Sequence, residues 1–300
     1  MKRRIGIVIC IAIFLGSIIS LFMIYASPKS NAELYDIEVE TTTIVNPTTT
    51  QEVNETTNSS QQIPTETIPV ENNVLNAWKQ VNDNVSGVIT VANLKAEPVV
   101  TTENQNEYLY LDIKGNYNQN GTLFTAADSK FGESKLTCIF GHNMNNGAMF
   151  GSLKSYKNID YLKEHPSFEI TTDEGTSKCK IVGVMFASAD YSLNDWYYPQ
   201  AELTEEEFEN FRFQVRSRSL YIIEDKFDYS SNYIMLSTCD YGSSNERFVV
   251  VARICDNNTN YNVQNNPLVL YTKEYYKENG FSEPSKNALK ENYMTYYTMS

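Results

Sequence analysis

A cysteine near the end of an apolar segment is the residue of this sequence best suited to nucleophilic chemistry. Cys239 follows the apolar residues 234–236 and precedes a polar segment rich in Gly, Ser and Asn. Side chains at the end of a strand, where it meets a loop, are frequently catalytic. A thiol becomes a nucleophilic thiolate near neutral pH only beside a base or a cation. The sequence therefore predicts that Cys239 is a nucleophile with a basic or cationic neighbour.

The chain contains 2 histidines, which makes the choice of that base simple. His142 follows the apolar residues 136–140 and lies where a strand is expected to meet a loop. His165 precedes Pro166 in a polar segment and is expected at the surface. His142 is therefore the predicted acid or base that accompanies Cys239.

Arg247 is the predicted cationic neighbour of Cys239. Residues 240–246 are typical of a hairpin connection, so Arg247 would open the next strand and return beside the thiol. Arg253 lies further along that strand, about 20 Å away at roughly 3.3 Å per residue, which is too far to reach the thiol. A guanidinium beside the thiol could hold a substrate carbonyl or stabilise an oxyanion.

Structural roles would explain the same three residues without any chemistry. A cysteine at a strand end can fill a core, a histidine can be a satisfied polar residue, and an arginine at a strand start can be a solvated edge charge. Cys138 and Cys179 lie within apolar strand patterns and are expected to be buried, whereas Cys255 fits either role. The histidines and cysteines lack the spacing of a zinc site, so we expect no metal. The cysteines outside the apolar N-terminal segment suggest no disulfide framework, so we expect no disulfide. We also expect no cofactor.

Short strands separated by turns must position these residues. The periodic segments 149–156 and 204–218 predict helices, the second opened by a capping box from Thr204 to Glu207. A further short helix is expected over 74–81, where the folded domain begins. The predicted strands are 87–91, 107–113, 136–140, 168–172, 179–186, 233–236 and 248–254. Mostly strands with two or three helices indicate a mainly β domain, either a barrel or a sandwich with inserted helices.

The N-terminus has the pattern of a single-pass membrane anchor. Residues 1–4 carry the basic side chains and are expected to be cytoplasmic. The uncharged apolar residues 5–26 would form a transmembrane helix of roughly 33 Å, enough to cross a hydrocarbon core of about 30 Å. The folded domain would then be extracellular. The rival interpretation is a cleaved signal peptide, with a shorter apolar region and small residues such as Ala26 and Ser27 at its cleavage site.

The rest of the chain divides by composition. Residues 27–73 are rich in Thr, Asn, Gln and Glu with scattered Pro, which indicates a flexible polar stalk; glycosylation or partner docking of this segment is the alternative. The folded domain is predicted over 74–255, and the Asn- and Tyr-rich residues 256–300 form an extension of undetermined order. The net charge of −13 argues against a nucleic-acid partner, because phosphate contacts need clustered cations.

The combination of motifs resembles the sortase family, with class B as the closest group. The similarity extends from about Leu75 to Ile254. Residues 187–227, which carry the 204–218 helix, match the class B feature of a helix between strands six and seven. The motifs, in the family's order, are Phe140-Gly141-His142-Asn143, then Met149-Phe150-Gly151-Ser152-Leu153 with Tyr156, then Leu236-Ser237-Thr238-Cys239, and then Asn245-Glu246-Arg247.

This resemblance implies a closed eight-stranded β-barrel and a cysteine transpeptidase of Gram-positive bacteria. Such an enzyme cuts a sorting signal near the C-terminus of secreted proteins through a Cys acyl-enzyme, and an amine of the cell wall or its precursor resolves that intermediate. The resemblance makes Cys239 the nucleophile. His142 would protonate the leaving amine and deprotonate the incoming one, and Arg247 would position the signal and stabilise the oxyanion.

The resemblance also assigns two substrate-binding residues. Ser237, two residues before the cysteine, matches a position that lines the substrate groove, and Leu109 matches a leucine that packs on the signal. The asparagine expected three residues before Tyr108 is Gln105 here, and Phe140 replaces a common tyrosine. These departures leave the catalytic trio intact and leave the identity of the sorting signal open.

Three other functions compete with this one. A pilin polymerase would use a protein lysine as acceptor and often carries a second membrane span, but residues 255–300 lack an apolar run of that length. Other cysteine enzymes of the wall place the cysteine before the histidine or use a compact Ser-His-Gly-Cys segment, and this sequence has neither pattern. A non-catalytic stalked surface module fits the acidic charge but leaves the combined motifs unexplained.

Overall fold

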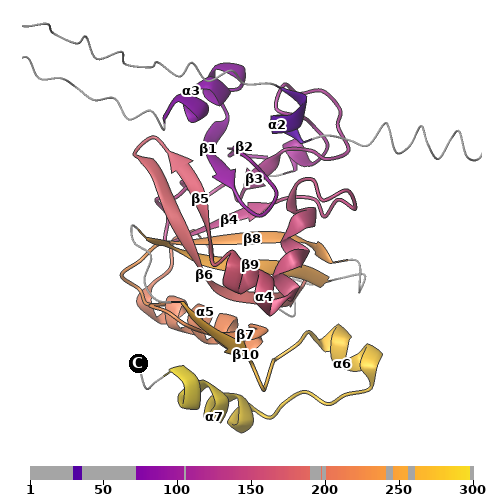
Figure 1. Ribbon diagram of the computed structural model, residues 1–300, viewed down its shortest axis with the longest axis vertical. Coiled ribbons are helices and arrows are strands. Elements are labelled where there is room, and N and C mark those ends of the chain that lie inside the picture. The colour runs from indigo at the N-terminus through magenta and orange to yellow at the C-terminus, as the bar shows by residue number, and fades with distance from the viewer. Residues whose placement is uncertain are drawn as a thin grey trace, which may run out of the picture.

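A closed β-barrel forms the centre of the chain (Figure 1). This computed structural model describes residues 30–35, 72–104, 106–189, 197, 201–240, 246–255 and 261–297. The strands follow the order β1-β2-β3-β4-β8-β9-β6-β5 around the barrel, which confirms the predicted mainly β fold with eight barrel strands. Their bounds are β1 Val85–Thr90, β2 Glu97–Val100, β3 Leu123–Thr125, β4 Leu136–Phe140, β5 Ser167–Thr172, β6 Gly175–Ser188, β8 Tyr233–Asp240 and β9 Glu246–Cys255.

Two pairs of barrel strands are parallel, and the other pairs are antiparallel. β2 pairs with β3 in parallel, and β4 pairs with β8 in parallel. β8 and β9 form an antiparallel hairpin, and β9 also pairs with the long strand β6. The strands β4, β8 and β9 are therefore direct neighbours, and their ends can bring residues from distant parts of the sequence together.

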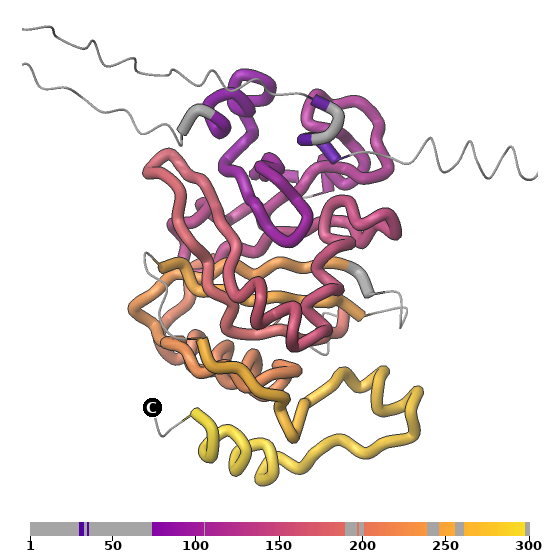
Figure 2. The backbone as a smooth tube through the Cα atoms, viewed as in Figure 1, coloured from indigo at the N-terminus to yellow at the C-terminus, as the bar shows by residue number. Residues whose placement is uncertain are grey.

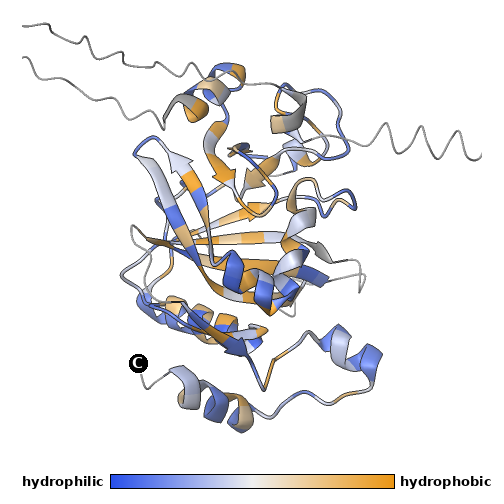
Figure 3. Cartoon of the chain, in the orientation of Figure 1, coloured by the Kyte–Doolittle hydropathy of each residue, from blue (hydrophilic) through white to orange (hydrophobic). Residues whose placement is uncertain are grey.

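The strand β8 is buried on both faces, which explains its uninterrupted apolar sequence. Ile234 and Leu236 belong to a core cluster to which all eight barrel strands contribute. Tyr233 and Met235 point to a second cluster, which β8 shares with the helix α5. Figure 3 shows the resulting band of hydrophobic residues along β8 and β9 at the centre of the molecule.

Helices lie around the barrel. The predicted capping box is confirmed at α5 (Glu205–Arg218), because the Thr204 hydroxyl accepts a hydrogen bond from the Glu207 amide and the Glu207 carboxylate accepts one from the Thr204 amide. The segment predicted as a helix over 149–156 is a 3₁₀ helix, η2. The remaining elements are α2 Asn31–Leu34, α3 Asn72–Val81, η1 Glu107–Leu109, η2 Phe150–Lys157, α4 Ile159–Glu164, β7 Tyr221–Glu224, β10 Asn262–Asn265, α6 Lys273–Asn279 and α7 Lys286–Tyr297.

The prediction of a strand over residues 107–113 is wrong. The segment forms η1 and then a turn, with Leu111 bridged to Tyr117. Asp112 causes the turn, since its carboxylate accepts hydrogen bonds from the backbone amides of Lys114 and Asn116, both at 2.9 Å. The alternation of apolar residues here follows a folded loop, not an extended strand.

The two predicted ends of the chain are only partly described. Residues 5–26 lie outside the described residues, and no helix among the described ones is long and apolar enough to cross a membrane. Within the predicted stalk, residues 30–35 pack against the barrel, so this part of it is not a free tether. The C-terminal extension contains β10, which pairs with β7 in a separate sheet, followed by α6 and α7 (Figure 2).

Candidate active site

Cys239 and Arg247 face each other across the β8–β9 hairpin. The antiparallel register pairs Cys239 with Arg247, and the Cα atoms of such partners lie about 4.5–5.5 Å apart. The Arg247 side chain is half-buried, and one guanidinium nitrogen donates to the carbonyl of Glu246 at 3.3 Å. The predicted connection was 240–246; Asp240 and Glu246 belong to the strands, and residues 241–245 lie outside the described residues. The predicted proximity of these two residues in the backbone register therefore holds.

Arg253 has a different role, as the strand spacing predicts. It lies near the far end of β9, where it is buried and donates to the Asp225 carboxylate at 3.2 Å. Lys180 lies 3.6 Å from the same carboxylate. Arg253 is thus part of a buried ion-pair cluster and does not reach the Cys239 end of the strand.

The parallel pairing of β4 with β8 brings His142 to the same edge. Phe140 pairs with Ser237, and the Gly141 amide continues the ladder by donating to the Ser237 carbonyl at 3.2 Å. His142 and Cys239 each follow the Phe140–Ser237 pair by two residues, so both lie beyond the same end of the β4–β8 ladder. Three adjacent strand ends therefore carry the three predicted catalytic residues.

The imidazole of His142 is held by a loop from another part of the chain. Its Nε2 atom lies 2.8 Å from the carbonyl oxygen of Leu109. The ring of Tyr110 stacks on it with centroids 5.2 Å apart. Because a carbonyl only accepts hydrogen bonds, Nε2 must carry the proton in this contact, which leaves Nδ1 as the nitrogen that can exchange a proton with a reactant.

The close packing of the segment after His142 fixes its backbone. The His142 carbonyl accepts from the Phe150 amide at 3.0 Å. A Cβ atom added to Gly151 would lie 2.1 Å from the Met144 carbonyl oxygen, so only glycine fits there. Met149 has a φ of 47°, a conformation that is costly for a residue with a side chain and that η2 must compensate. The close contact with Met144 explains the glycine of the motif that follows the histidine.

The two predicted substrate-binding residues differ in their surroundings. Leu109 is half-buried and packs beside a core cluster that contains Val100 and Phe124, and its carbonyl is the atom that reaches His142. Ser237 is 2% exposed, and its hydroxyl is hydrogen-bonded to the hydroxyl of Tyr197. A substrate would reach the Ser237 hydroxyl only by displacing Tyr197.

The buried cysteines Cys138 and Cys179 are poor nucleophiles. Burial, with a contribution from Asp128, raises the pKa of Cys138 to about 12. Burial also raises the pKa of Cys179 well above its ordinary value. A thiol in such surroundings stays protonated and inert at neutral pH.

Among the described residues, no group of three or more His, Cys, Asp or Glu side chains is placed to hold a metal ion.

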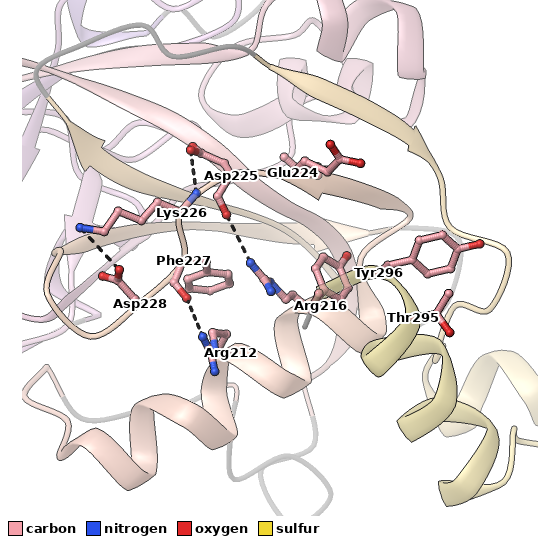
Figure 4. Close-up of a pocket in the computed structure, with 11 residues that line it drawn as sticks. Arg212, Arg216, Glu224, Asp225, Lys226, Phe227, Asp228, Thr295 and Tyr296 are labelled. Atoms are coloured by element: carbon pink, nitrogen blue, oxygen red, sulfur yellow. Dashed lines mark hydrogen bonds and ion pairs between the residues drawn. The ribbon is translucent and has the colours of Figure 1, made fainter. Parts of the chain in front are cut away.

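A cavity of about 670 Å³ lies elsewhere, between α5, the connection after β7, and α7 (Figure 4). Arg216 donates to the Asp225 carbonyl at 3.3 Å, and Arg212 donates to the Phe227 carbonyl at 3.2 Å. Acidic and basic side chains alternate around it, and none of the predicted catalytic residues lines it. The predicted chemistry therefore belongs to the β4–β8–β9 edge and not to this cavity.

Sequence reasoning missed two contributors to the site. Tyr110, whose ring stacks on His142, is half-exposed and lies in a segment predicted as a strand. Thr272, from the C-terminal extension, donates its hydroxyl to the buried carboxylate of Glu246, next to Arg247. No local signal marks either residue, because both act through contacts with distant parts of the chain.

Comparison with known proteins gives a consistent result. The family model described as "Sortase domain" matches residues 89–255. Sortase B of Listeria monocytogenes is 27% identical over 165 residues, and the alignment spans 54% of this chain and 65% of that protein. Sortase B of Staphylococcus aureus is 21% identical over 180 residues, 59% of this chain and 72% of that protein.

Solved structures share the fold. The structure of Clostridium perfringens sortase B superposes with a TM-score of 0.56 at 23% identity, covering 60% of this chain and 99% of that one. Listeria monocytogenes sortase B gives a TM-score of 0.52 at 25% identity, covering 58% of this chain and 97% of that one. The family match ends at residue 255, so the described residues 261–297 lie beyond it.

Proposed function

The chain belongs to the sortase family and is similar to its class B members. We therefore propose that it is a cysteine transpeptidase acting on sorting signals of secreted proteins. The observation that carries the proposal is the convergence of His142, Cys239 and Arg247 on three adjacent strand ends. A nucleophile, a proton carrier and an oxyanion-stabilising cation are the groups that acyl transfer requires.

The first half of the reaction forms an acyl-enzyme. The Cys239 sulfur, as thiolate, attacks the carbonyl carbon of the scissile amide, and the carbonyl oxygen becomes an oxyanion that the Arg247 guanidinium stabilises. The carbon–nitrogen bond then breaks, and protonated His142 gives its Nδ1 proton to the leaving amine. The products of this half are a thioester on Cys239 and a free amine.

The second half transfers the acyl group to a new amine. The acceptor amine attacks the thioester carbon and loses a proton to the Nδ1 atom of His142. The carbon–sulfur bond breaks, the new amide leaves, and the Cys239 thiolate with protonated His142 is regenerated. We propose an amine of the cell wall or its precursor as the acceptor.

The proposed location is the outer face of the cell membrane. The basic residues 1–4 and the apolar residues 5–26 support a single-pass anchor with a cytoplasmic N-terminus. A secreted substrate and a wall amine would both be available to a catalytic domain on that side.

The test uses the full-length protein in detergent with quenched fluorescent peptides that carry candidate sorting signals. We expect peptide cleavage, a covalent acyl-enzyme visible as added protein mass, and complete loss of both in Cys239→Ala. Cys255→Ala is the matched control. This cysteine is the last residue of β9, at the end away from Arg247, so its substitution should leave turnover unchanged. Turnover that persists in Cys239→Ala would refute the mechanism.

A further inference from the structure

A short segment near the N-terminus is docked on the barrel, far in sequence from its partners (Figure 1). Residues 30–35 contain α2, and Ser30 and Asn31 are buried with 4% and 0% of their surfaces exposed. The Glu97 carboxylate on β2, also 0% exposed, accepts hydrogen bonds from the amides of Asn31 at 2.7 Å and Ala32 at 3.1 Å. This buried carboxylate fixes the segment by its backbone.

The Asn31 side chain joins the middle of one loop, residues 106–122, to the C-terminal end of that loop. Its Oδ1 atom accepts from the Ile113 amide at 2.9 Å. Its Nδ2 atom donates to the Thr122 hydroxyl at 3.1 Å and lies 3.4 Å from the Gly121 carbonyl oxygen. A buried amide that satisfies both its donor and its acceptor in this way holds its partners in one arrangement.

Tyr35 adds a second attachment to the same loop. Its hydroxyl donates to the Asp112 carboxylate at 2.6 Å, and the Lys114 ammonium lies 4.1 Å from the centre of its ring. Asp112 is the residue that forms the central turn of the loop. The docked segment therefore contacts the loop at its middle as well as at its end.

The loop thus held is the one that holds the catalytic histidine. Leu109 supplies the carbonyl that receives the Nε2 proton of His142, and Tyr110 supplies the stacked ring. The end of the loop that Asn31 binds lies directly against Leu109, because a Cβ atom on Gly121 would be 2.4 Å from the Leu109 carbonyl oxygen. A movement of Gly121 towards Leu109 would therefore displace the carbonyl that orients His142.

We propose that residues 30–35 form a clamp that sets the orientation and the tautomer of His142 through the loop 106–122, with Asn31 as its principal positioning residue. The clamp acts on the histidine and does not touch the substrate. Its role in catalysis rests on the proposed function, but its effect on the imidazole does not.

The two histidines of the chain make the clamp directly measurable. His142 contacts a carbonyl through Nε2, whereas the Nδ1 atom of His165 lies 3.1 Å from the carbonyl of Tyr161. The neutral rings should therefore be opposite tautomers, which ¹⁵N chemical shifts of histidine-labelled protein distinguish. His165 is an internal reference, since it lies after α4 and stacks on Tyr161.

The experiment compares full-length wild type with Asn31→Ala in detergent, and with Asn76→Ala, an exposed asparagine of α3, as the matched control. We expect the His142 signals of Asn31→Ala to move from the Nε2–H tautomer towards a mixture while the His165 signals stay in place. We expect kcat to fall about tenfold with little change in KM, since a misplaced catalytic group slows the chemical step.

The outcomes separate the clamp from the proposed function. Unchanged His142 signals in a folded Asn31→Ala protein would overturn the clamp, whether or not the enzyme turns over. A wild type without transpeptidase activity but with the expected ¹⁵N shifts would refute the proposed function alone. If Asn31→Ala does not fold, Tyr35→Phe replaces it, because this change keeps the ring and removes only the hydrogen bond to Asp112. The ¹⁵N signals of His142 should then move in the same direction by a smaller amount.

Discussion

His142 has one ring nitrogen committed to a backbone carbonyl, and this single contact decides how the residue can act. Because Nε2 donates to the Leu109 carbonyl, Nδ1 is the nitrogen that remains available for proton exchange. The strand register places Arg247 opposite Cys239, and Cys239 and His142 both follow the last β4–β8 pair by two residues. At the scale of residues, the site is a set of backbone positions fixed by the sheet and one side chain fixed by a loop.

The two arginines of β9 should separate activity from stability. Arg247→Lys removes the planar guanidinium beside Cys239 and should lower kcat/KM by about 10²-fold. The free energy of unfolding should be nearly unchanged, because the half-buried Arg247 side chain donates to a neighbouring backbone carbonyl and not to a buried carboxylate. Arg253→Met should cost about 3 kcal/mol of stability, since it breaks the buried pair with Asp225. Peptide cleavage rates and urea unfolding measure the two effects, and equal stability losses would contradict the assignment.

Glu97 should make the stability of the domain depend on pH. Burial raises its pKa to about 7 from an ordinary 4.5, in spite of the hydrogen bonds it accepts from Ala32 and Asn31. The folded protein therefore binds a proton that the unfolded chain releases, so this stability is fully present below about pH 4.5 and is lost as pH rises through about 7. The loss is on the order of 3 kcal/mol.

Urea unfolding at pH 5 and pH 8 tests this pH dependence. The free energy of unfolding should fall between the two pH values for wild type, and Glu97→Gln should abolish most of that fall. An exposed carboxylate provides the matched control: Glu103→Gln should leave the wild-type difference intact. An identical pH response in wild type and Glu97→Gln would show that another group is responsible.

At the scale of elements, the helix α5 shows how local signals and packing combine. Its capping box fixes where it begins, and Phe208, Phe211 and Val215 bury its apolar side against β8 and β9. The C-terminal extension is built differently, since β10 covers the edge of β7 and Thr272 reaches back to Glu246. Its position depends on partners that its own sequence does not reveal.

The cap of α5 gives a local prediction. Thr204→Ala removes the hydroxyl that accepts from the Glu207 amide and should lower the free energy of unfolding by about 1 kcal/mol. Thr204→Ser keeps the hydroxyl and should retain most of the stability. Thermal unfolding of the two variants is the measurement, and an equal loss in both would argue against the capping bond as the cause.

At the scale of the whole molecule, the docked segment determines how the barrel would stand on a membrane. Ser30 follows Ala26, the last residue of the proposed span, by four residues, which reach at most about 14 Å. Figure 1 shows α2 and α7 at opposite ends of the molecule. The face that binds α2 should therefore lie near the bilayer, and the α7 end should lie away from it.

Energy transfer in nanodiscs tests this orientation. A dye at Lys114→Cys, in the loop beneath α2, should transfer efficiently to acceptor lipids, whereas a dye at Asn287→Cys, in α7, should transfer weakly. Both variants are made in the Cys239→Ala background to avoid labelling the nucleophile. Equal transfer from the two sites would contradict a barrel held close to the membrane.

Features of this protein that depend on neighbouring residues can be predicted from local sequence patterns. The hairpin that pairs Cys239 with Arg247, the capping box of α5 and the burial of Cys138 all follow from local patterns. The scarcity of histidine was enough to select His142. Composition did not reveal that residues 30–35 dock on the barrel or that β10 pairs with β7.

The contacts that hold His142 could not be predicted from the sequence, because they form between distant segments of the folded chain. The apolar alternation around Leu109 predicted a strand, but a strand needs a neighbouring strand to pair with, and this segment instead folds back on itself around Asp112. The contacts that fix it come from Asn31, about 80 residues earlier in the chain, and from Asn82. Such long-range hydrogen bonds leave no periodicity in the sequence, because each depends on where two distant segments happen to meet once the barrel has closed.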